Sequence, residues 1–144
     1  MLKGIDPLLS PELLGILRMM GHGDEIAIVD GNYPADAHAK RIVRADGHSA
    51  TAVLDAVLSL IPLDDFVPEA CWVPVPIDGA DPAQPIFADF QAIIDRREPG
   101  FKLAALRGQS FYDRVKGAYC IIGTSERRLY GNVILKKGVI RPGA

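Results

Sequence analysis

The chain has 144 residues, of which 49% are hydrophobic, 24% charged and 7% aromatic. These values are ordinary for a globular protein and exclude a disordered, collagen-like or coiled-coil chain. At about 150 residues per domain, the length predicts one domain over residues 1–144. Sixteen Lys and Arg against eighteen Asp and Glu give a net charge of −2, which argues against a nucleic-acid partner because nucleic acids attract basic surfaces.

No stretch approaches the roughly 18 apolar residues of a membrane-spanning helix, so we expect no membrane partner. The polar N-terminal segment lacks the pattern of a signal peptide. Cys71 and Cys120 both lie in apolar runs, where we expect small buried thiols rather than a disulfide. These features together predict a cytoplasmic protein.

The first elements are a helix and a buried strand. Ser10 followed by Pro11 is typical of a helix start, and Gly21 is expected to close this helix in a left-handed conformation. Residues 25–29 form a short apolar run, which predicts a buried strand that ends at Asp30.

Further amphipathic helices and short strands alternate along the rest of the chain. The pattern predicts an α/β fold in which helices pack on a layered sheet. Prolines in the segment 71–76 confine it to a sheet edge or a strand end. The expected elements are a helix over 49–61, an extended segment over 71–76, a helix over 85–97, a strand over 101–106, a helix capped by Ser110 and strands over 119–122 and 133–135.

Standard nucleotide-binding, zinc-protease and nucleophile-elbow motifs are absent from the sequence. The three histidines, His22, His38 and His48, are too far apart for any two to share a helix face as metal ligands, so we expect no metal. His38 and His48 are expected on the surface or in loops.

Two short segments could bear chemistry. Glycines flank His22, so its imidazole is left uncovered, and the strand that follows ends at Asp30. If both reached one small ligand, they would form an acid–base pair or a clamp; alternatively, His22 caps the end of a helix. Tyr130 and Asn132 offer a flat face, a hydroxyl, a donor and an acceptor that suit a sugar, although the segment is also compatible with an ordinary turn.

Six short blocks follow one another along the chain: LSPELL (9–14), MGHGDEI (20–26), IVRADG (42–47), IPLD (61–64), FYDR (111–114) and YGNVILKKGV (130–139). Taken in this order, the blocks resemble the L-fucose mutarotase branch of the family that also contains D-ribose pyranase, the RbsD/FucU family. D-ribose pyranases share the Gly-His pair, the strand-end Asp and the Tyr-x-Asn pattern but match the second and third blocks less closely.

The resemblance implies an RbsD-like α/β subunit in a toroidal homo-oligomer, commonly a decamer, with each monosaccharide site where subunits meet. It also implies a metal- and nucleotide-independent isomerase that interconverts the α and β anomers of a free aldose, L-fucose or a related sugar. By matching position, His22 is the general acid. The sugar contacts implied are Asp30, Tyr130 and Asn132, with Asp64 and Tyr112 matching positions implicated in animal relatives.

One position departs from the resemblance. Fucose-type sequences usually place an Arg four residues before the Tyr of Phe-Tyr, where this chain has Gly108 and carries Arg107 one residue earlier. In a strand, this shift would turn the side chain to the opposite face. In a loop, Gly108 could let Arg107 take over as the sugar contact.

Two other functions remain open from the sequence. The chain could be a sugar-binding accessory protein of transport or regulation without catalysis, or it could isomerise the pyranose and furanose ring forms of a sugar as D-ribose pyranases do. The base that takes the anomeric proton could be Asp30 or a bound water.

Overall fold

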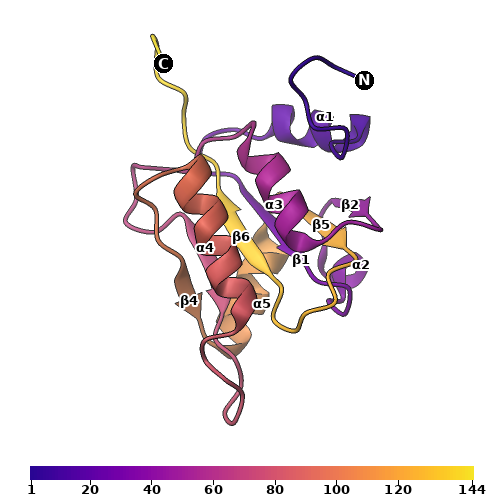
Figure 1. Cartoon of the computed structure of the whole chain (residues 1–144), viewed down its shortest axis with the longest axis vertical. Coiled ribbons are helices and arrows are strands. Elements are labelled where there is room, and N and C mark those ends of the chain that lie inside the picture. Colours follow the sequence, from indigo (N-terminus) through magenta and orange to yellow (C-terminus); the bar gives the residue numbers. More distant parts are fainter.

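A computed structural model describes residues 1–144 and contains one six-stranded mixed sheet with helices on both faces (Figure 1). The strand order is β2-β5-β1-β6-β3-β4. The strands are β1 (Glu25–Val29), β2 (Ile42–Ala45), β3 (Cys71–Pro74), β4 (Ala104–Leu106), β5 (Cys120–Thr124) and β6 (Val133–Lys136). The helices are α1 (Pro11–Met19), α2 (Ala35–His38), α3 (Ala50–Leu58), α4 (Pro85–Arg97) and α5 (Gly108–Gly117).

Strand β1 lies in the middle of the sheet and pairs parallel with β5 and antiparallel with β6. Ile26 stands opposite Cys120 on one side and Leu135 on the other. Only β6 runs against the other strands. The apolar run 26–29 is fully buried, as expected for a strand covered on both faces.

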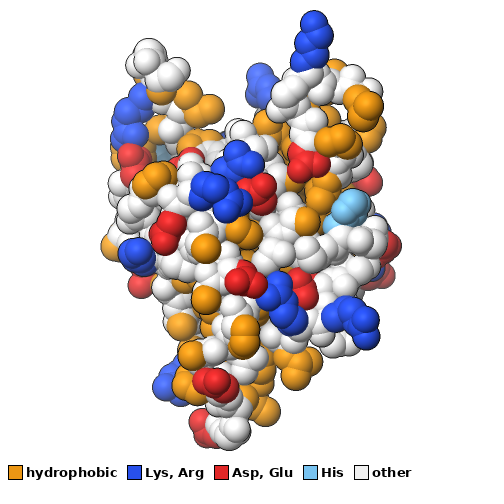
Figure 2. Space-filling view, viewed as in Figure 1, with side chains coloured by type: hydrophobic (Ala, Val, Ile, Leu, Met, Phe, Trp, Pro, Cys, Tyr) orange, Lys and Arg blue, Asp and Glu red, His pale blue; other side chains and the backbone are white.

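Two hydrophobic clusters lie on the two faces of the sheet. Helices α1, α3 and α4 pack on one face, where Leu13, Leu54 and Phe90 are fully or almost fully buried. Helix α5 packs on the other face, where Phe111 and Val115 lie against strand residues. The predicted α/β layering is therefore confirmed. Positive and negative side chains are interspersed on the face of the molecule shown in Figure 2.

The predicted helix starts are confirmed where a hydroxyl caps the first turn. Ser10 Oγ accepts a hydrogen bond from Leu13 N at 3.1 Å, and Ser49 Oγ accepts one from Ala52 N at 3.2 Å. Helix α4 spans 85–97 as predicted. Helix α3 ends at Leu58, three residues before the predicted end.

The predicted left-handed end of α1 at Gly21 is wrong. Met20 caps α1 in an extended conformation, and the positive φ of +87° falls at Gly23. The Nζ of Lys137 donates hydrogen bonds to the carbonyl oxygens of Leu17 and Met20, at 2.9 and 2.6 Å. Because these carbonyls have a side-chain partner, the helix needs no glycine to satisfy them.

Other expectations differ from the structure near short elements. Ser110 lies inside α5, which begins at Gly108, and does not cap it. The prolines of segment 71–76 predicted a sheet edge or a strand end, and the second alternative is confirmed: β4 pairs with β3 on its far side, and Pro74 is the last residue of β3, where a proline costs no interior ladder bond. The four-residue elements α2 and β2 were not predicted. Cys71 and Cys120 are buried free thiols, as expected.

The longest helix has 13 residues, and none of the helices is long and apolar enough to span a membrane.

Candidate active site

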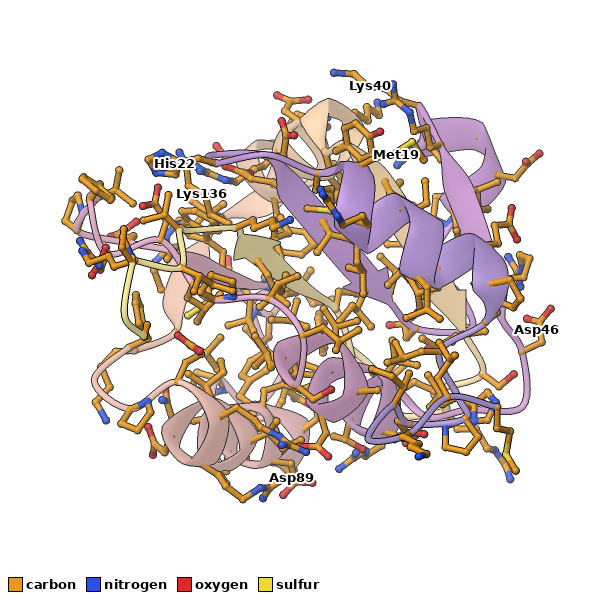
Figure 3. The ribbon with its side chains drawn as sticks, turned by 90° about the horizontal axis from the view of Figure 1, so that it is seen from above. Met19, His22, Lys40, Asp46, Asp89 and Lys136 are labelled. Carbon is orange, nitrogen blue, oxygen red and sulfur yellow. The ribbon has the colours of Figure 1, made fainter.

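His22 lies in the turn that leads into β1, at one end of the sheet. Gly23 takes the left-handed conformation, and Gly21 N donates to Asp24 Oδ2 at 2.8 Å, so the turn is closed without using the imidazole. The His22 side chain is 43% exposed. His22 and Lys136 lie close together at this end, seen from above in Figure 3.

A buried carboxylate holds the imidazole. Nε2 of His22 donates to Oδ1 of Asp64 at 3.0 Å, and the Asp64 side chain is only 2% exposed. Phe66 N donates to the same oxygen at 3.0 Å, and the Phe66 ring lies 5.0 Å from the imidazole. Because Asp64 occupies Nε2, Nδ1 is the nitrogen left for a ligand.

Asp64 is ionised behind the imidazole. Burial alone would raise the pKa of Asp64, but the Phe66 N–H, His22 and then Lys136 outweigh it and hold the pKa below its usual value. The resemblance implied a sugar contact for Asp64, whereas the structure covers this carboxylate and bonds it to His22. No group of three or more His, Cys, Asp and Glu side chains is arranged to hold a metal ion.

Asp30 and Asn132 form a second polar group, where β1 ends and β6 begins. Both are mostly buried, 7% and 8% exposed. Asp30 N donates to Asn132 Oδ1 at 2.8 Å, and Asn32 N donates to Asp30 Oδ1 at 3.0 Å. Burial raises the pKa of Asp30, against hydrogen bonds from the N–H groups of Asn32 and Gly131, so this carboxylate is a stronger base than an exposed one.

The loop before β6 presents Tyr130 beside this pair. Tyr130 has a φ of +60°, a conformation that is uncommon outside glycine. Gly131 is tightly enclosed, because a Cβ there would lie 2.8 Å from Glu126 Cγ. Glu126 is itself buried, and its carbonyl accepts a hydrogen bond from Gly31 N at 2.9 Å. Through these contacts of Glu126, the loop that contains Tyr130 packs against the loop that follows Asp30.

An aromatic cavity of about 100 Å³ opens at this end of the sheet. Its polar and aromatic walls come from the loop after β1, the first turns of α5 and the loop before β6. Small-molecule pockets usually measure about 300–1,000 Å³, so this cavity is too small to enclose a ligand by itself. It is lined by Tyr33, Pro74, Val75, Ile77, Gly108, Phe111, Tyr112, Tyr130 and Asn132.

Arg107 lies at the junction between β4 and α5, outside any strand. It precedes α5 in an extended conformation, and its exposed side chain forms no hydrogen bond or ion pair in the structure. Gly108 has a φ of +44° and lines the cavity. The shift of one residue therefore falls at the junction between β4 and α5, outside any strand, where it does not turn the side chain to the other face of a sheet.

Within one chain, the two groups do not meet. His22 precedes β1 and Asp30 follows it, and a five-residue strand spans roughly 16 Å. The structure brings together Asp30, Tyr112, Tyr130 and Asn132, but it places His22 with Asp64 at the opposite end of the sheet.

Two residues beside the cavity were not identified from the sequence. Tyr33 lines it, and the Oη of Tyr33 lies 2.9 Å from Nδ1 of His38. His38 is partly exposed at the end of α2, and its contact with Tyr33 was not expected; His48 is exposed, as predicted. The sequence bears no signal for this contact, because it depends on the unpredicted single turn of α2.

The fold and the two polar groups, His22 with Asp64 and Asp30 with Asn132, define a class of protein: a mixed-sheet α/β protein that has titratable and hydrogen-bonding side chains at both ends of its sheet. Residues 3–140 match the model of the RbsD / FucU transport protein family, and the chain belongs to this family. The resemblance drawn from the ordered sequence blocks is therefore confirmed.

Curated relatives and a solved structure agree with this family assignment. The chain is 43% identical to the fucose mutarotase of Bos taurus over 147 residues, covering 98% of this chain and 95% of that protein. It is also 43% identical to the fucose mutarotase of Homo sapiens, covering 96% and 94%. The fucose mutarotase from Streptococcus pneumoniae, solved in complex with L-fucose, is 39% identical with a TM-score of 0.92, covering 97% of this chain and all of that one.

Proposed function

We propose that this protein is a mutarotase that interconverts the α and β anomers of L-fucose. The proposal rests on one observation above others: a half-exposed imidazole whose Nε2 is held by a buried carboxylate while Nδ1 remains free. A protein that only binds sugar has no need of such a group. The names of the curated relatives, and the L-fucose complex of the Streptococcus pneumoniae protein, support the same substrate.

The reaction requires two proton transfers. His22, as the general acid, donates a proton to the ring oxygen, and a base removes the proton of the anomeric hydroxyl. The ring opens to an aldehyde, the C1–C2 bond rotates, and closure on the other face gives the other anomer with the protons returned. A positioned acid or base contributes about 10²–10⁴-fold.

Asp64 acts through His22 and not on the sugar. Its ionised carboxylate keeps the proton on Nε2 and stabilises the imidazolium formed when Nδ1 is protonated. Asp30 is the group we assign as the base for the anomeric hydroxyl, because burial raises its pKa and so strengthens it as a base. Tyr130, Asn132 and Tyr112 contact the sugar.

The complete site needs two copies of the chain. Since His22 and Asp30 lie at opposite ends of β1, we assign His22 of one copy to the cavity of a neighbour, in a toroidal homo-oligomer such as a decamer. Apolar side chains at both ends support such a contact: Phe66 beside His22 is 63% exposed, and Ile77 beside the cavity is 73% exposed. Arg107 is free to turn toward the sugar from the rim. The two unpaired thiols fit a protein of the reducing cytoplasm.

Magnetisation-exchange NMR on equilibrium mixtures of L-fucose anomers tests the activity. We expect the wild-type protein to accelerate exchange, and His22→Ala to lose most of the acceleration while it still binds L-fucose. D-ribose in the same assay, followed at its pyranose and furanose signals, tests ring-size isomerisation. Saturable binding of L-fucose without any acceleration would instead favour an accessory sugar-binding protein.

Mixed oligomers test the shared site. His22→Ala and Asp30→Asn are each expected to be inactive, but a randomly mixed 1:1 oligomer would pair an intact His22 with an intact Asp30 in about a quarter of its sites. Recovery of about a quarter of the wild-type rate supports a site between copies. No recovery, in oligomers shown by mass spectrometry to be mixed, contradicts it.

A further inference from the structure

The wall of the cavity includes a tyrosine, Tyr33, whose ring has an aromatic contact on two sides. The Oη of Tyr33 lies 2.9 Å from Nδ1 of His38, and the two rings meet edge to face with centroids 5.3 Å apart. On its other side, the Tyr33 ring stacks on Tyr112 with centroids 5.7 Å apart and an interplanar angle of 24°. Tyr33 and Tyr112 both line the cavity.

The local fold explains why this tyrosine belongs to the same site as Asp30. Tyr33 follows Asp30 by three residues, in a turn closed by the hydrogen bond from Asn32 N to the Asp30 carboxylate. Pro34 then directly precedes α2, whose last residue is His38. The single turn of α2 therefore places the imidazole of His38 against the phenol of Tyr33.

The hydrogen-bonding capacity of the pair is constrained. Burial, then Tyr112 and Asp30, raise the pKa of Tyr33, so the phenol keeps its proton. Burial and the charge of Lys116 lower the pKa of His38, which favours the neutral imidazole. In the tautomer that has its proton on Nε2, Nδ1 of His38 is unprotonated and accepts the hydrogen bond of the Tyr33 phenol, and we assign this tautomer to His38. The Tyr33 oxygen then has only lone pairs to offer to another partner.

We infer that Tyr33 recognises one hydroxyl of the bound sugar by accepting a hydrogen bond from it. We infer also that His38 is the positioning residue that orients the phenol of Tyr33 for this contact. The inference rests on the proposed sugar site. It names a specificity contact: the ligand is an aldopyranose with a hydroxyl that can donate at this wall, and a sugar without that hydroxyl leaves the Tyr33 oxygen unpaired. The hydroxyl of Tyr33 is not needed for its packing, because stacking on Tyr112 uses only the ring. The backbone conformation of Tyr33 does not require the hydroxyl either.

Deoxy sugars identify the hydroxyl. The wild-type protein and Tyr33→Phe are titrated with L-fucose and with its 2-, 3- and 4-deoxy analogues, and Kd is measured for each. A hydrogen bond of this kind contributes about 1 kcal/mol net, so Tyr33→Phe should weaken L-fucose binding about fivefold. This loss should disappear for one analogue only. An equal loss for every sugar, or no loss for L-fucose, overturns the inference.

Substitutions of His38 separate positioning from a merely structural role. His38→Ala should raise KM about two- to fivefold with kcat retained, and it should have no further effect in the Tyr33→Phe background. His38→Asn, whose amide can replace Nδ1 as a partner, should restore KM to near the wild-type value. His48→Ala is the matched control, since that imidazole is exposed and has no side-chain partner. Equal effects of His38→Ala with and without the Tyr33 hydroxyl overturn the positioning role.

The two proposals fail differently. A wild-type protein that binds no L-fucose contradicts both the mutarotase and the Tyr33 contact. A wild-type protein that accelerates anomer exchange, together with a Tyr33→Phe variant that binds all four sugars as the wild type does, contradicts the Tyr33 contact alone.

Discussion

Replacing Asp64 by Asn is the most direct test of how His22 is held. The substitution removes the charge behind Nε2 but keeps an oxygen that can accept its hydrogen bond, and it changes the side-chain volume little. The Asp64 side chain is only 2% exposed, and its Oδ1 lies 3.0 Å from Nε2 of His22. Water therefore cannot reach this position to compensate for the lost charge. We therefore expect the effect of a buried, charge-assisted hydrogen bond rather than that of a surface ion pair.

The magnitude follows from the contact. A hydrogen bond to a charged group contributes about 1.5–3 kcal/mol, and the amide retains part of it, so we expect kcat to fall about 10- to 100-fold. KM should change less than about threefold, because His22 and Phe66 separate this carboxylate from a ligand. Magnetisation-exchange NMR over a range of L-fucose concentrations measures both quantities.

Asp65→Asn is the control. This neighbouring carboxylate is exposed and pairs with Arg141 at 2.7 Å, so its removal should change kcat by less than about twofold. A large rise of KM in Asp64→Asn with kcat unchanged would mean that Asp64 contacts the sugar, as the sequence resemblance implied. A wild-type kcat in Asp64→Asn would refute the positioning role altogether.

Three further predictions concern stability and are measured by urea unfolding. Hydrogen bonds from Arg97, and then from Arg96, hold the pKa of Asp55 at about 2. Because the pKa is lower in the folded state, Asp55→Asn should lower the free energy of unfolding by about 1–2 kcal/mol at pH 7. This difference should vanish as the pH falls from about 4 toward 2, where Asp55 becomes protonated. An unchanged cost at low pH would contradict the ion pair as its source. Lys137→Met leaves two carbonyl groups at the end of α1 without their partner and should cost about 1–3 kcal/mol, so a loss below about 0.5 kcal/mol would count against this cap. Gly131→Ala forces a Cβ to within 2.8 Å of a buried side chain and should cost about 1–3 kcal/mol and raise KM, whereas Gly15→Ala, in an open position of α1, should be neutral or stabilising.

Local sequence patterns were sufficient for the long elements. Ser10 and Ser49 are followed by apolar residues at helical spacing, and a capping hydroxyl satisfies the first turn wherever that turn lies in the fold. The run 26–29 is apolar at every position, as expected of a short strand that is buried on both faces. The α/β class and the identity of His22, Asp30, Tyr130 and Asn132 as candidates followed from such patterns and from the ordered blocks.

Elements with distant partners were predicted less well. The end of α1 depends on Lys137, more than a hundred residues away. The four-residue elements α2 and β2 are too short to show a period, so their formation depends on packing.

The sequence by itself therefore determined which residues can transfer protons and bind hydroxyl groups, since acidity and hydrogen-bonding capacity belong to the side chain. Only the tertiary structure decided which of them act together. Asp64 lies 42 positions from His22 in sequence yet within 3.0 Å of it, whereas Asp30, only eight positions away, lies at the far end of an extended strand. A strand separates its own ends, and a sheet brings distant segments together, so proximity in this site follows strand order rather than chain order.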